Sequence, residues 1–285
     1  MNNVNKTNDL SDILVSVIMP AHNVADFIGL AIESVLKQSH SNLQLIVVDD
    51  DSSDSSATIV EGFVSNDSRI TLIRLDAQSG GPSKPRNTAL QNIDGAFVAF
   101  LDADDVWHLD KLKYQLELMH VHKLDFTSTR HIKFIDAIDN TLVNVSSAEH
   151  LQVSIISHQQ ILRKNKIVCS GVMLSVSYAK QIEFSENEYV GVEDYLAWLK
   201  LLEDPSIRAA IVNAPLVFYR LRSDSLSNSK FKMAKKIYSL LSRYSPNGQR
   251  LGIKKYLYFG YYVVAGSTIF ILDKLRMANK QRGNS

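Results

Sequence analysis

The feature that most constrains the fold is the alternation of short apolar runs with amphipathic segments over the first 122 residues. The apolar runs are rich in β-branched residues and predict buried strands. These strands are predicted at 14–20, 43–50, 70–75 and 95–104. The intervening segments have apolar residues at helical spacing, and helices are predicted at 25–38, 53–64, 85–92 and 110–122. This alternation predicts an α/β fold with a mainly parallel, Rossmann-like central sheet and helices on both faces.

The pattern changes after residue 125, where less regular strand signals replace the alternation. Residues 126–136 and 141–145 flank an Asp139-Asn140 turn and predict antiparallel strands. The other predicted elements of this half are a short helix at 158–165, a strand at 167–174, a helix at 192–204 and one or two strands within 208–222. From Lys230 to the end the signals are helical, basic and aromatic.

Composition narrows the class of protein. Hydrophobic residues make up 45% of the chain and charged residues 21%, which excludes disorder over the bulk of the chain. The one cysteine, Cys169, excludes an intramolecular disulfide and a cysteine-rich zinc site. The polar first 12 residues lack the apolar segment of a secretory signal, so we expect a cytoplasmic protein with a flexible N-terminus.

Two of the predicted strands end in acidic clusters, Asp49-Asp50-Asp51 and Asp102-Ala103-Asp104-Asp105. Ligands of parallel α/β sheets bind beyond the carboxyl ends of the strands, so we expect these carboxylates to converge. The alternative is that the acids cap the next helix or occupy turns. Converging clusters repel each other unless a cation neutralises them, and carboxylate oxygens favour Mg²⁺ or Mn²⁺. The two clusters together therefore predict a divalent metal site.

A glycine-rich segment, SGGPSKPRN at 79–87, lies between the two clusters along the chain. Glycines followed by Lys84 and Arg86 at a helix start suit a phosphate group, and a turn with surface basic residues is the alternative. The spacing is not that of a P-loop, because no Gly-Lys-Ser/Thr follows at the required distance. Acids, a metal and basic groups together indicate a metal-bridged diphosphate, most simply a nucleotide-diphosphate compound.

The motifs VSVIMPAHN, VVDDDSSDSS, GPSKPRNTAL and FLDADDVW occur in this order and are followed by the pair Glu193-Asp194. Together they resemble glycosyltransferase family two, the inverting sugar transferases of bacterial polysaccharide and O-antigen type, over residues 14–226. The resemblance implies the GT-A fold, followed here by a C-terminal helical extension. It also implies a nucleotide-sugar donor, with UDP as the default and GDP or dTDP left open, and Mn²⁺ or Mg²⁺ as cofactor.

The resemblance further implies roles for individual residues of the donor site. The residues that match the family's motifs are Pro20, Ala21 and His22 in the turn that holds the base, Asp50 against the pyrimidine ring, Asp49 in support of that loop, Arg86 near the nucleotide, and Asp102, Ala103 and Asp104 in the DxD motif. Asp102 is expected to face the ribose or the metal, and either Asp104 or Asp105 to ligate the metal. Arg222 lies in a segment that closes over the diphosphate in the family, and it stands where His is common.

By the same resemblance, Asp194 is the general base. An acid in the first turn of a predicted helix is also favoured by the helix dipole, so capping is the alternative role. We expect that position to favour the ionised carboxylate, as a base requires. In the implied mechanism Asp194 takes the proton of an acceptor hydroxyl, the nucleoside diphosphate leaves from the opposite face, and the configuration of the sugar inverts.

Charge divides the chain at residue 229. Residues 1–229 carry 19 Lys and Arg and 29 Asp and Glu, a net charge of −10, whereas residues 230–285 carry 12 basic residues and one acid, a net charge of +11. An uncharged run at 256–272 lies within this tail and approaches the minimum length of a spanning helix. Three interpretations stay open: a helix packed on the catalytic domain, peripheral contact with a membrane, and a membrane span. No nucleic-acid partner is expected, because no recognised nucleic-acid-binding motif is present.

These observations predict three parts: an N-terminus at 1–12, a catalytic domain at 13–228 with a nucleotide-binding half (13–105) and an acceptor half (106–228), and a helical tail at 229–285. The predicted function is inverting transfer of a hexosyl or N-acetylhexosaminyl group from a nucleotide sugar to a saccharide hydroxyl. We expect a lipid-linked acceptor at the inner face of the cytoplasmic membrane, in polysaccharide synthesis. The alternative is a catalytically silent module that binds nucleotide sugars. A sugar nucleotidyltransferase is disfavoured, because that class carries its glycine-rich loop directly after the first strand, whereas the glycines here follow the third predicted strand.

Overall fold

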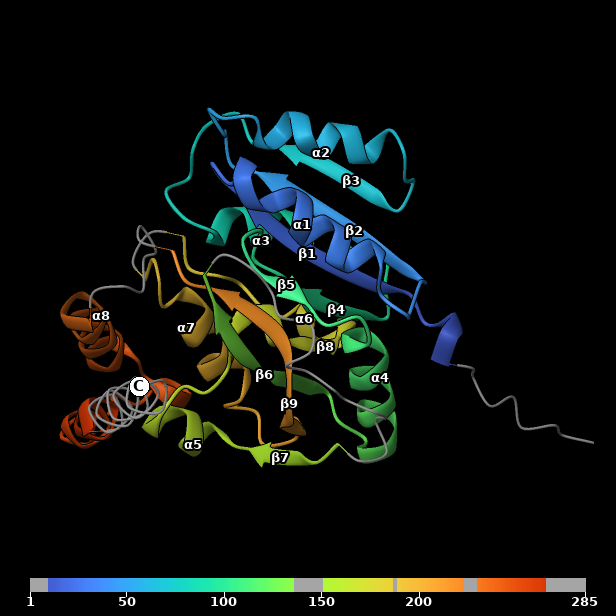
Figure 1. The fold of residues 1–285 in the computed structure, drawn as a ribbon. Helices are drawn as coiled ribbons and strands as arrows, with labels where there is room; N and C mark the ends of the chain where they lie inside the picture. Colours follow the sequence, from blue (N-terminus) through green and yellow to red (C-terminus); the bar gives the residue numbers. More distant parts are fainter. Residues whose placement is uncertain (1–9, 136–150, 187–188, 223–229, 265–285) are drawn as a thin grey trace, which may run out of the picture.

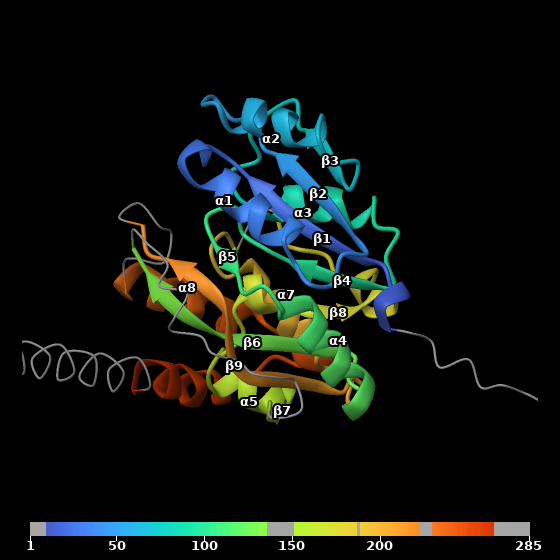
Figure 2. The ribbon, with the colours of Figure 1, turned by 45° about the vertical axis from the view of Figure 1, so that its right-hand side comes forward.

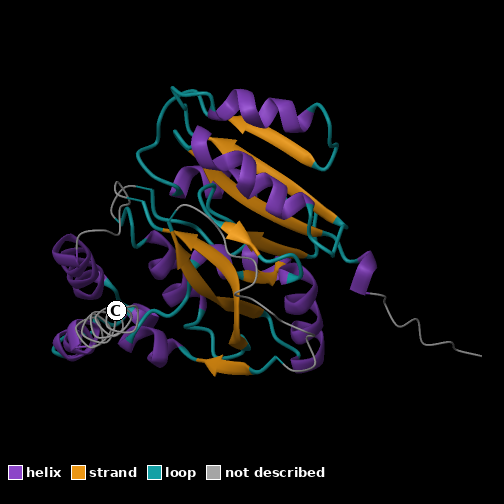
Figure 3. Ribbon diagram, viewed as in Figure 1, coloured by secondary structure: helices purple, strands orange, loops and turns teal. Residues whose placement is uncertain are grey.

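A mixed sheet runs through the molecule (Figure 1). The structure, a computed structural model, describes residues 10–135, 151–186, 189–222 and 230–264. Within these ranges nine strands join in the order β3-β2-β1-β4-β8-β6-β9-β5, and β7 pairs with β9 at the side of this path. Helices cover both faces of the sheet (Figure 3), which confirms the predicted α/β architecture.

The strands are β1 Val15–Ala21, β2 Leu43–Asp49, β3 Ile70–Arg74, β4 Phe97–Phe100, β5 Val106–Trp107, β6 Phe126–Phe134, β7 Val153–Ile156, β8 Met173–Ser175 and β9 Ala209–Arg220. The helices are α1 Ala25–Leu36, α2 Ser56–Val64, α3 Ser83–Leu90, α4 Lys111–His122, α5 His158–Arg163, α6 Val176–Ala179, α7 Glu193–Leu201 and α8 Lys230–Arg243. Short 3₁₀ turns occur at Leu10–Asp12, Cys169–Gly171 and Pro246–Gly248, and residues 254–264 are helical.

The first half of the chain builds the parallel part of the sheet. β1 pairs in parallel with β2 and with β4, and β2 pairs in parallel with β3. Successive side chains of a strand point to opposite faces, so Val17 and Met19 join the core under α1 with Ile28, whereas Ile18 joins the opposite core with Leu90 of α3. This arrangement confirms the predicted alternation and brings the carboxyl ends of β1, β2 and β4 to one edge.

The second half adds strands that are mostly antiparallel. β8 pairs antiparallel with both β4 and β6, while β9 pairs parallel with β6 and antiparallel with β5 and β7. β9 is one continuous strand of 12 residues, where one or two strands were expected. The predicted strand at 141–145 and its Asp139-Asn140 turn lie outside the described residues.

The predicted strand at 167–174 is wrong over most of its length. A 3₁₀ turn occupies its middle, Cys169–Gly171, and only its end belongs to β8. Trp107 Nε1 and Gln115 Nε2 donate hydrogen bonds to two carbonyls of this turn, at 2.7 and 3.0 Å. Because these backbone groups are bonded to side chains, they do not take part in a β-ladder.

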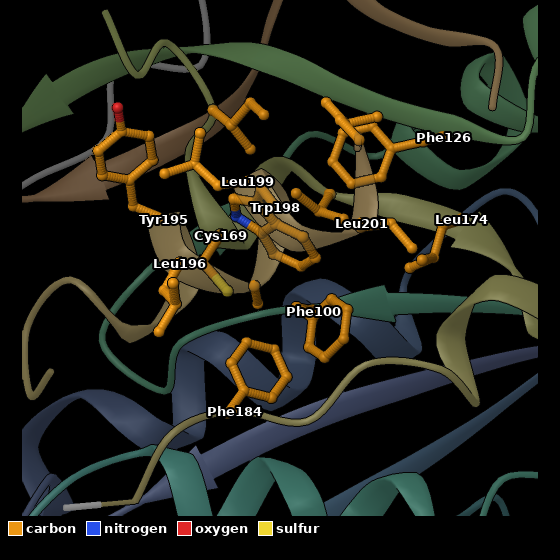
Figure 4. Close-up of a cluster of buried hydrophobic side chains, with 14 of the residues drawn as sticks. Phe100, Phe126, Cys169, Leu174, Phe184, Tyr195, Leu196, Trp198, Leu199 and Leu201 are labelled. Atoms are coloured by element: carbon orange, nitrogen blue, oxygen red, sulfur yellow. The ribbon is translucent and has the colours of Figure 1, made fainter. Parts of the chain in front are cut away.

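An aromatic cluster joins α7 to both halves of the sheet (Figure 4). Trp198 of α7 is fully buried and lies edge-on to Phe100, Phe126 and Phe184, with ring centroids 5.8, 5.3 and 5.9 Å away. Edge-to-face pairs at these distances are favourable. Since Phe100 ends β4 and Phe126 begins β6, this packing fixes α7 relative to the strand end that carries the second acidic cluster.

The tail packs one of its faces on the α/β part of the chain. The side chains of α8 and its C-terminal neighbour that are buried there are Ile237, Leu240, Leu241 and Tyr244. The helical residues 254–264 lie beside α5 (Figure 2) and pack on the same core through Tyr258, Phe259 and Tyr262. Among the described residues no helix is long and apolar enough to cross a membrane, and the rest of the predicted apolar run, 265–272, lies beyond them. Of the three interpretations of the tail, packing on the rest of the protein therefore holds for one face of its described helices.

Candidate active site

Two loops that follow β1 and β2 meet at the edge of the parallel strands. Asp50 accepts hydrogen bonds from the backbone N–H of Ser79 (2.9 Å) and from its hydroxyl (2.8 Å). The backbone N–H of Asp50 donates to the Ala21 carbonyl at 2.8 Å. His22 Nδ1 lies 2.8 Å from the Asp50 carbonyl oxygen, and its Nε2 lies 3.0 Å from Gln78 Nε2. The predicted base-binding residues therefore come together with the start of the glycine-rich segment.

Asp49 and Pro20 lie in the strands that lead into these two loops. Both belong to the paired ends of β2 and β1. Asp49 is buried, and one of its carboxylate oxygens accepts from the Ser52 N–H at 3.2 Å. The other oxygen, Oδ1, is buried without a hydrogen-bond partner. Asp49 thus lies inside the loop, as the resemblance implied, and does not face the open side of the site.

The second acidic cluster forms a tight turn after β4, here called the acid turn, Asp102–Asp105. Asp105 is 1% exposed, and its carboxylate accepts from the Arg220 N–H (2.9 Å) and from the Ser170 hydroxyl (2.5 Å). The Asp102 and Asp104 side chains, in contrast, are 33% and 28% exposed. Both oxygens of Asp105 are engaged inside the protein, so the geometry favours Asp104 over Asp105 as the metal ligand.

Asp104 lies in an environment that suits a cation. Burial, and then the neighbouring carboxylate of Asp102, raise the pKa of Asp104, while Arg222 opposes the rise. Arg222 Nη1 lies 3.5 Å from Asp104 Oδ2, and its guanidinium lies 4.9 Å from the Phe27 ring centroid. The described residues contain no group of three or more His, Cys, Asp or Glu side chains placed to hold a metal. A metal here would be held by Asp102 and Asp104 and would need further oxygen ligands from a bound substrate.

Arg86 of α3 connects the acid turn to α7. Its side chain is 3% exposed, and it donates to Asp102 Oδ1 at 2.7 Å and to Glu193 Oε1 at 3.0 Å. Its guanidinium also lies 5.3 Å from the Phe184 ring centroid. Arg86 therefore lies between the acid turn and α7, where it neutralises two carboxylates rather than extending toward an open surface. Lys84, the other cation of this segment, is exposed.

Asp194 lies in the first turn of α7, next to Glu193. Burial, and then the charge of Glu193, raise the pKa of Asp194 to about 7, while Arg86 and the Tyr195 N–H oppose the rise. The Tyr195 N–H donates to Asp194 Oδ1 at 2.6 Å. A carboxylate with this pKa ionises near neutral pH and still binds a proton readily, which are the properties of a general base.

Three residues to which the sequence assigned no role take part in the site. Glu193 binds Arg86 with one oxygen and the Gly191 N–H with the other, so it orients rather than reacts. Ser79 holds Asp50, and Ser170 holds Asp105. Glu193 was visible as half of a Glu-Asp pair, whereas the two serines gave no signal, because serine is common in turns. In the segment that carries Arg222, residues 223–229 lie outside the described part of the chain.

Comparisons with known proteins show which family the chain resembles. The family model described as Glycosyl transferase family 2 matches residues 16–177, more than half of the chain. The chain is 34% identical over 257 residues to the Escherichia coli UDP-Glc:alpha-D-GlcNAc-diphosphoundecaprenol beta-1,3-glucosyltransferase WfgD, covering 90% of this chain and 95% of that protein. It is 35% identical over 227 residues to the putative teichuronic acid biosynthesis glycosyltransferase TuaG of Bacillus subtilis, covering 79% and 86%.

Solved structures show the same fold. The crystal structure of S. aureus TarS 1-349 in complex with UDP-GlcNAc aligns with a TM-score of 0.63 and 21% identity, over 80% of this chain and 66% of that chain. The mannosyltransferase PcManGT from Pyrobaculum calidifontis, in complex with GDP-Man and Mn²⁺, aligns with a TM-score of 0.58 and 16% identity, over 86% and 69%. This chain thus spans about two thirds of the length of each of these structures. The matches to the family model and to full-length relatives place the chain in glycosyltransferase family 2, as a glycosyltransferase with the GT-A fold.

Proposed function

We propose that this enzyme transfers a hexosyl group from a UDP-sugar to a hydroxyl of a lipid-linked saccharide, with inversion at the anomeric carbon. The observation that carries the proposal is Asp194, a carboxyl with a pKa of about 7 that lies beside the acid turn through Arg86 and Glu193. The printed name of the Escherichia coli relative, a UDP-Glc-dependent glucosyltransferase acting on alpha-D-GlcNAc-diphosphoundecaprenol, supports the donor and acceptor classes. UDP-glucose and a GlcNAc-diphospho-lipid are therefore the first substrates to assay.

On the donor side, we assign the nucleoside to the loops that meet at Asp50 and the diphosphate to the acid turn. His22 and Asp50 line the end of the sheet where the base would lie. Asp102 and Asp104 would hold Mn²⁺ or Mg²⁺, which supplies positive charge to the leaving diphosphate when bound. Arg222, 3.5 Å from Asp104, adds a second positive charge on the same side.

On the acceptor side, we assign proton transfer to Asp194. It accepts the proton of the acceptor hydroxyl as that oxygen attacks the anomeric carbon, and the diphosphate departs from the other face. Glu193 is unsuited to a nucleophilic role, because Arg86 and the Gly191 N–H occupy its two oxygens. With Asp194 as base and no nucleophilic role for Glu193, the reaction is a single displacement, and single displacement inverts configuration, as it does in glycoside hydrolysis.

Replacement of Asp194 by Asn tests the proposal against the alternative of a silent binding module. We expect transfer to fall by about 10²–10⁴-fold, because general-base catalysis contributes that much, while UDP binding persists. The measurement is sugar transfer from UDP-glucose to a GlcNAc-diphospho-lipid, with Asp204→Asn as control, an exposed acid beyond the other end of α7. An unchanged rate in Asp194→Asn would contradict the role of base. A wild-type protein that binds UDP but neither transfers nor hydrolyses the sugar would support the silent module.

The dependence of the rate on pH provides a second test. The pKa of Asp194 is raised to about 7, so the base is mostly protonated below this pH and mostly ionised above it. We therefore expect kcat/KM to rise as pH increases through about 7 and then to level off. The charged groups around Asp194 are Glu193, Arg86 and Asp102. A rate that does not change through pH 7 would show that another group, with a different pKa, accepts the proton.

We also propose that the exposed face of the tail contacts an anionic membrane surface. The large apolar side chains exposed there are Phe231, Ile253, Tyr256, Leu257, Tyr261, Val263 and Val264. They lie in a segment with a net charge of +11. Apolar and aromatic side chains among Lys and Arg suit the interface of a bilayer, where each positive group adds about 1 kcal/mol on an anionic surface.

Vesicle sedimentation tests this contact. We expect the protein to bind phosphatidylglycerol vesicles, to bind phosphatidylcholine vesicles weakly, and to dissociate as salt is raised. The double variant Phe231→Ser/Ile253→Ser should bind about tenfold more weakly or worse, because two apolar side chains no longer enter the interface. Leu109→Ser, which alters an exposed apolar residue outside the tail, is the control. Equal binding of the double variant and the wild type would contradict the contact.

A further inference from the structure

One buried hydroxyl spans the two ends of the acid turn. Ser170 is fully buried, and its Oγ accepts a hydrogen bond from the Asp102 N–H at 3.2 Å. The same hydroxyl donates to Asp105 Oδ2 at 2.5 Å. Its donor and acceptor capacity is therefore directed at the first and the last residue of the turn, with Asp104 between them.

The turn that carries Ser170, Cys169–Gly171, is itself held by side chains that follow the acid turn in the chain. Trp107 Nε1 donates to the Ser170 carbonyl at 2.7 Å, and Gln115 Nε2 donates to the Gly171 carbonyl at 3.0 Å. A Cβ at position 171 would lie 3.0 Å from Ser128 Oγ and from the Thr129 nitrogen. The close approach of the backbone to β6 thus depends on a glycine, and it leaves the turn little room to shift.

Lys111, which the proposed reaction does not use, completes this support. It is fully buried, and its Nζ donates to Gln115 Oε1 at 2.7 Å and lies 3.9 Å from the Trp107 ring centroid. The bond to Oε1 fixes the orientation of the Gln115 amide, so that its Nε2 points to Gly171 and to Thr127. A buried ammonium group is costly unless its hydrogen-bond partners are in place, so Lys111, Gln115 and Trp107 depend on one another.

On the side opposite Ser170, the end of β9 holds the acid turn. The Arg220 N–H donates to Asp105 Oδ1 at 2.9 Å, and Arg220 Nε donates to the Asp104 carbonyl oxygen at 2.9 Å. The Asp105 carboxylate is thus held by Ser170 on one side and by Arg220 on the other. The consequence is that Asp102 and Asp104, the partly exposed acids, are carried on a turn whose backbone has little freedom.

We propose that Ser170 is a positioning residue of the donor site, whose hydroxyl holds the acid turn so that Asp102 and Asp104 present their carboxylates together to a metal-bound nucleoside diphosphate. The inference rests on the proposed function, because it concerns the same site. Without the hydroxyl the Asp102 N–H and Asp105 Oδ2 lose a buried partner, and the turn is free to relax. The cost falls on binding of the metal-nucleotide complex, which needs both carboxylates in place.

Calorimetric titration of UDP, with and without Mn²⁺, tests this role. For Ser170→Ala we expect the Kd for UDP in the presence of Mn²⁺ to rise about tenfold or more, as for a lost hydrogen bond to a charged group. The Kd for UDP without metal should stay within about twofold of the wild type, because the loops at Asp50 do not contact Ser170. Ser128→Ala is the matched control, a fully buried serine beside the same turn that makes no bond to the acids, and it should bind as the wild type does.

A second variant, Trp107→Phe, guards against loss of folding in Ser170→Ala. It keeps a ring but removes the N–H that donates to the Ser170 carbonyl, and we expect a smaller rise in the same metal-dependent Kd. Thermal unfolding of each variant identifies any that fails to fold. If Ser170→Ala does not fold, the titration of Trp107→Phe decides whether the turn supports metal-dependent binding. Wild-type binding in the folded variants, or equal weakening with and without Mn²⁺, would overturn the role of Ser170. A wild-type protein that binds no UDP with Mn²⁺ would instead overturn the donor site itself.

Discussion

The site depends on a buried arginine that lies between two carboxylates. Arg86 comes from α3 and binds Asp102 of the acid turn and Glu193 of α7, so one guanidinium joins the donor side of the site to the base side. Replacing Arg86 would leave the buried Glu193 carboxylate without its cation, and breaking a buried ion pair in this way costs about 3–5 kcal/mol. The same positive charge opposes the rise in the pKa of Asp194 that burial and Glu193 cause. The packing of the site and the pKa of Asp194 thus both depend on the guanidinium of Arg86.

The parallel and the antiparallel part of the sheet support different sides of the site. The parallel strands bring the loops after β1, β2 and β4 to one edge, where Asp50 and the acid turn lie. The antiparallel strands support these loops from the other side, through the turn before β8 and the end of β9. α7 packs against both through Trp198 (Figure 4). The first turn of the same helix carries Asp194.

Sequence reasoning predicted the parallel half and the strand ends at which the acidic clusters lie, because apolar strands that end in acids have a strong local pattern. It predicted a strand where Cys169–Gly171 form a turn, since the apolar run there looks like a strand and the bonds from Trp107 and Gln115 come from residues far along the chain. For the same reason it left Asp104 and Asp105 as equal candidates: only the tertiary bonds of Asp105 to Ser170 and Arg220 distinguish them. The alternatives for the tail depended on packing that no local pattern encodes.

The measurement that tests the central claim most directly is the anomeric configuration of the product. The enzyme is given UDP-glucose, in which glucose is α-linked, and a GlcNAc-diphospho-lipid, and the new glycosidic bond is examined by NMR. The account predicts a β-linkage, because it assigns Asp194 as the base of a single displacement, while Glu193 is bound to Arg86 and Gly191 and is not available as a nucleophile. An α-linked product would contradict single displacement and would require a different residue to attack or shield the anomeric carbon.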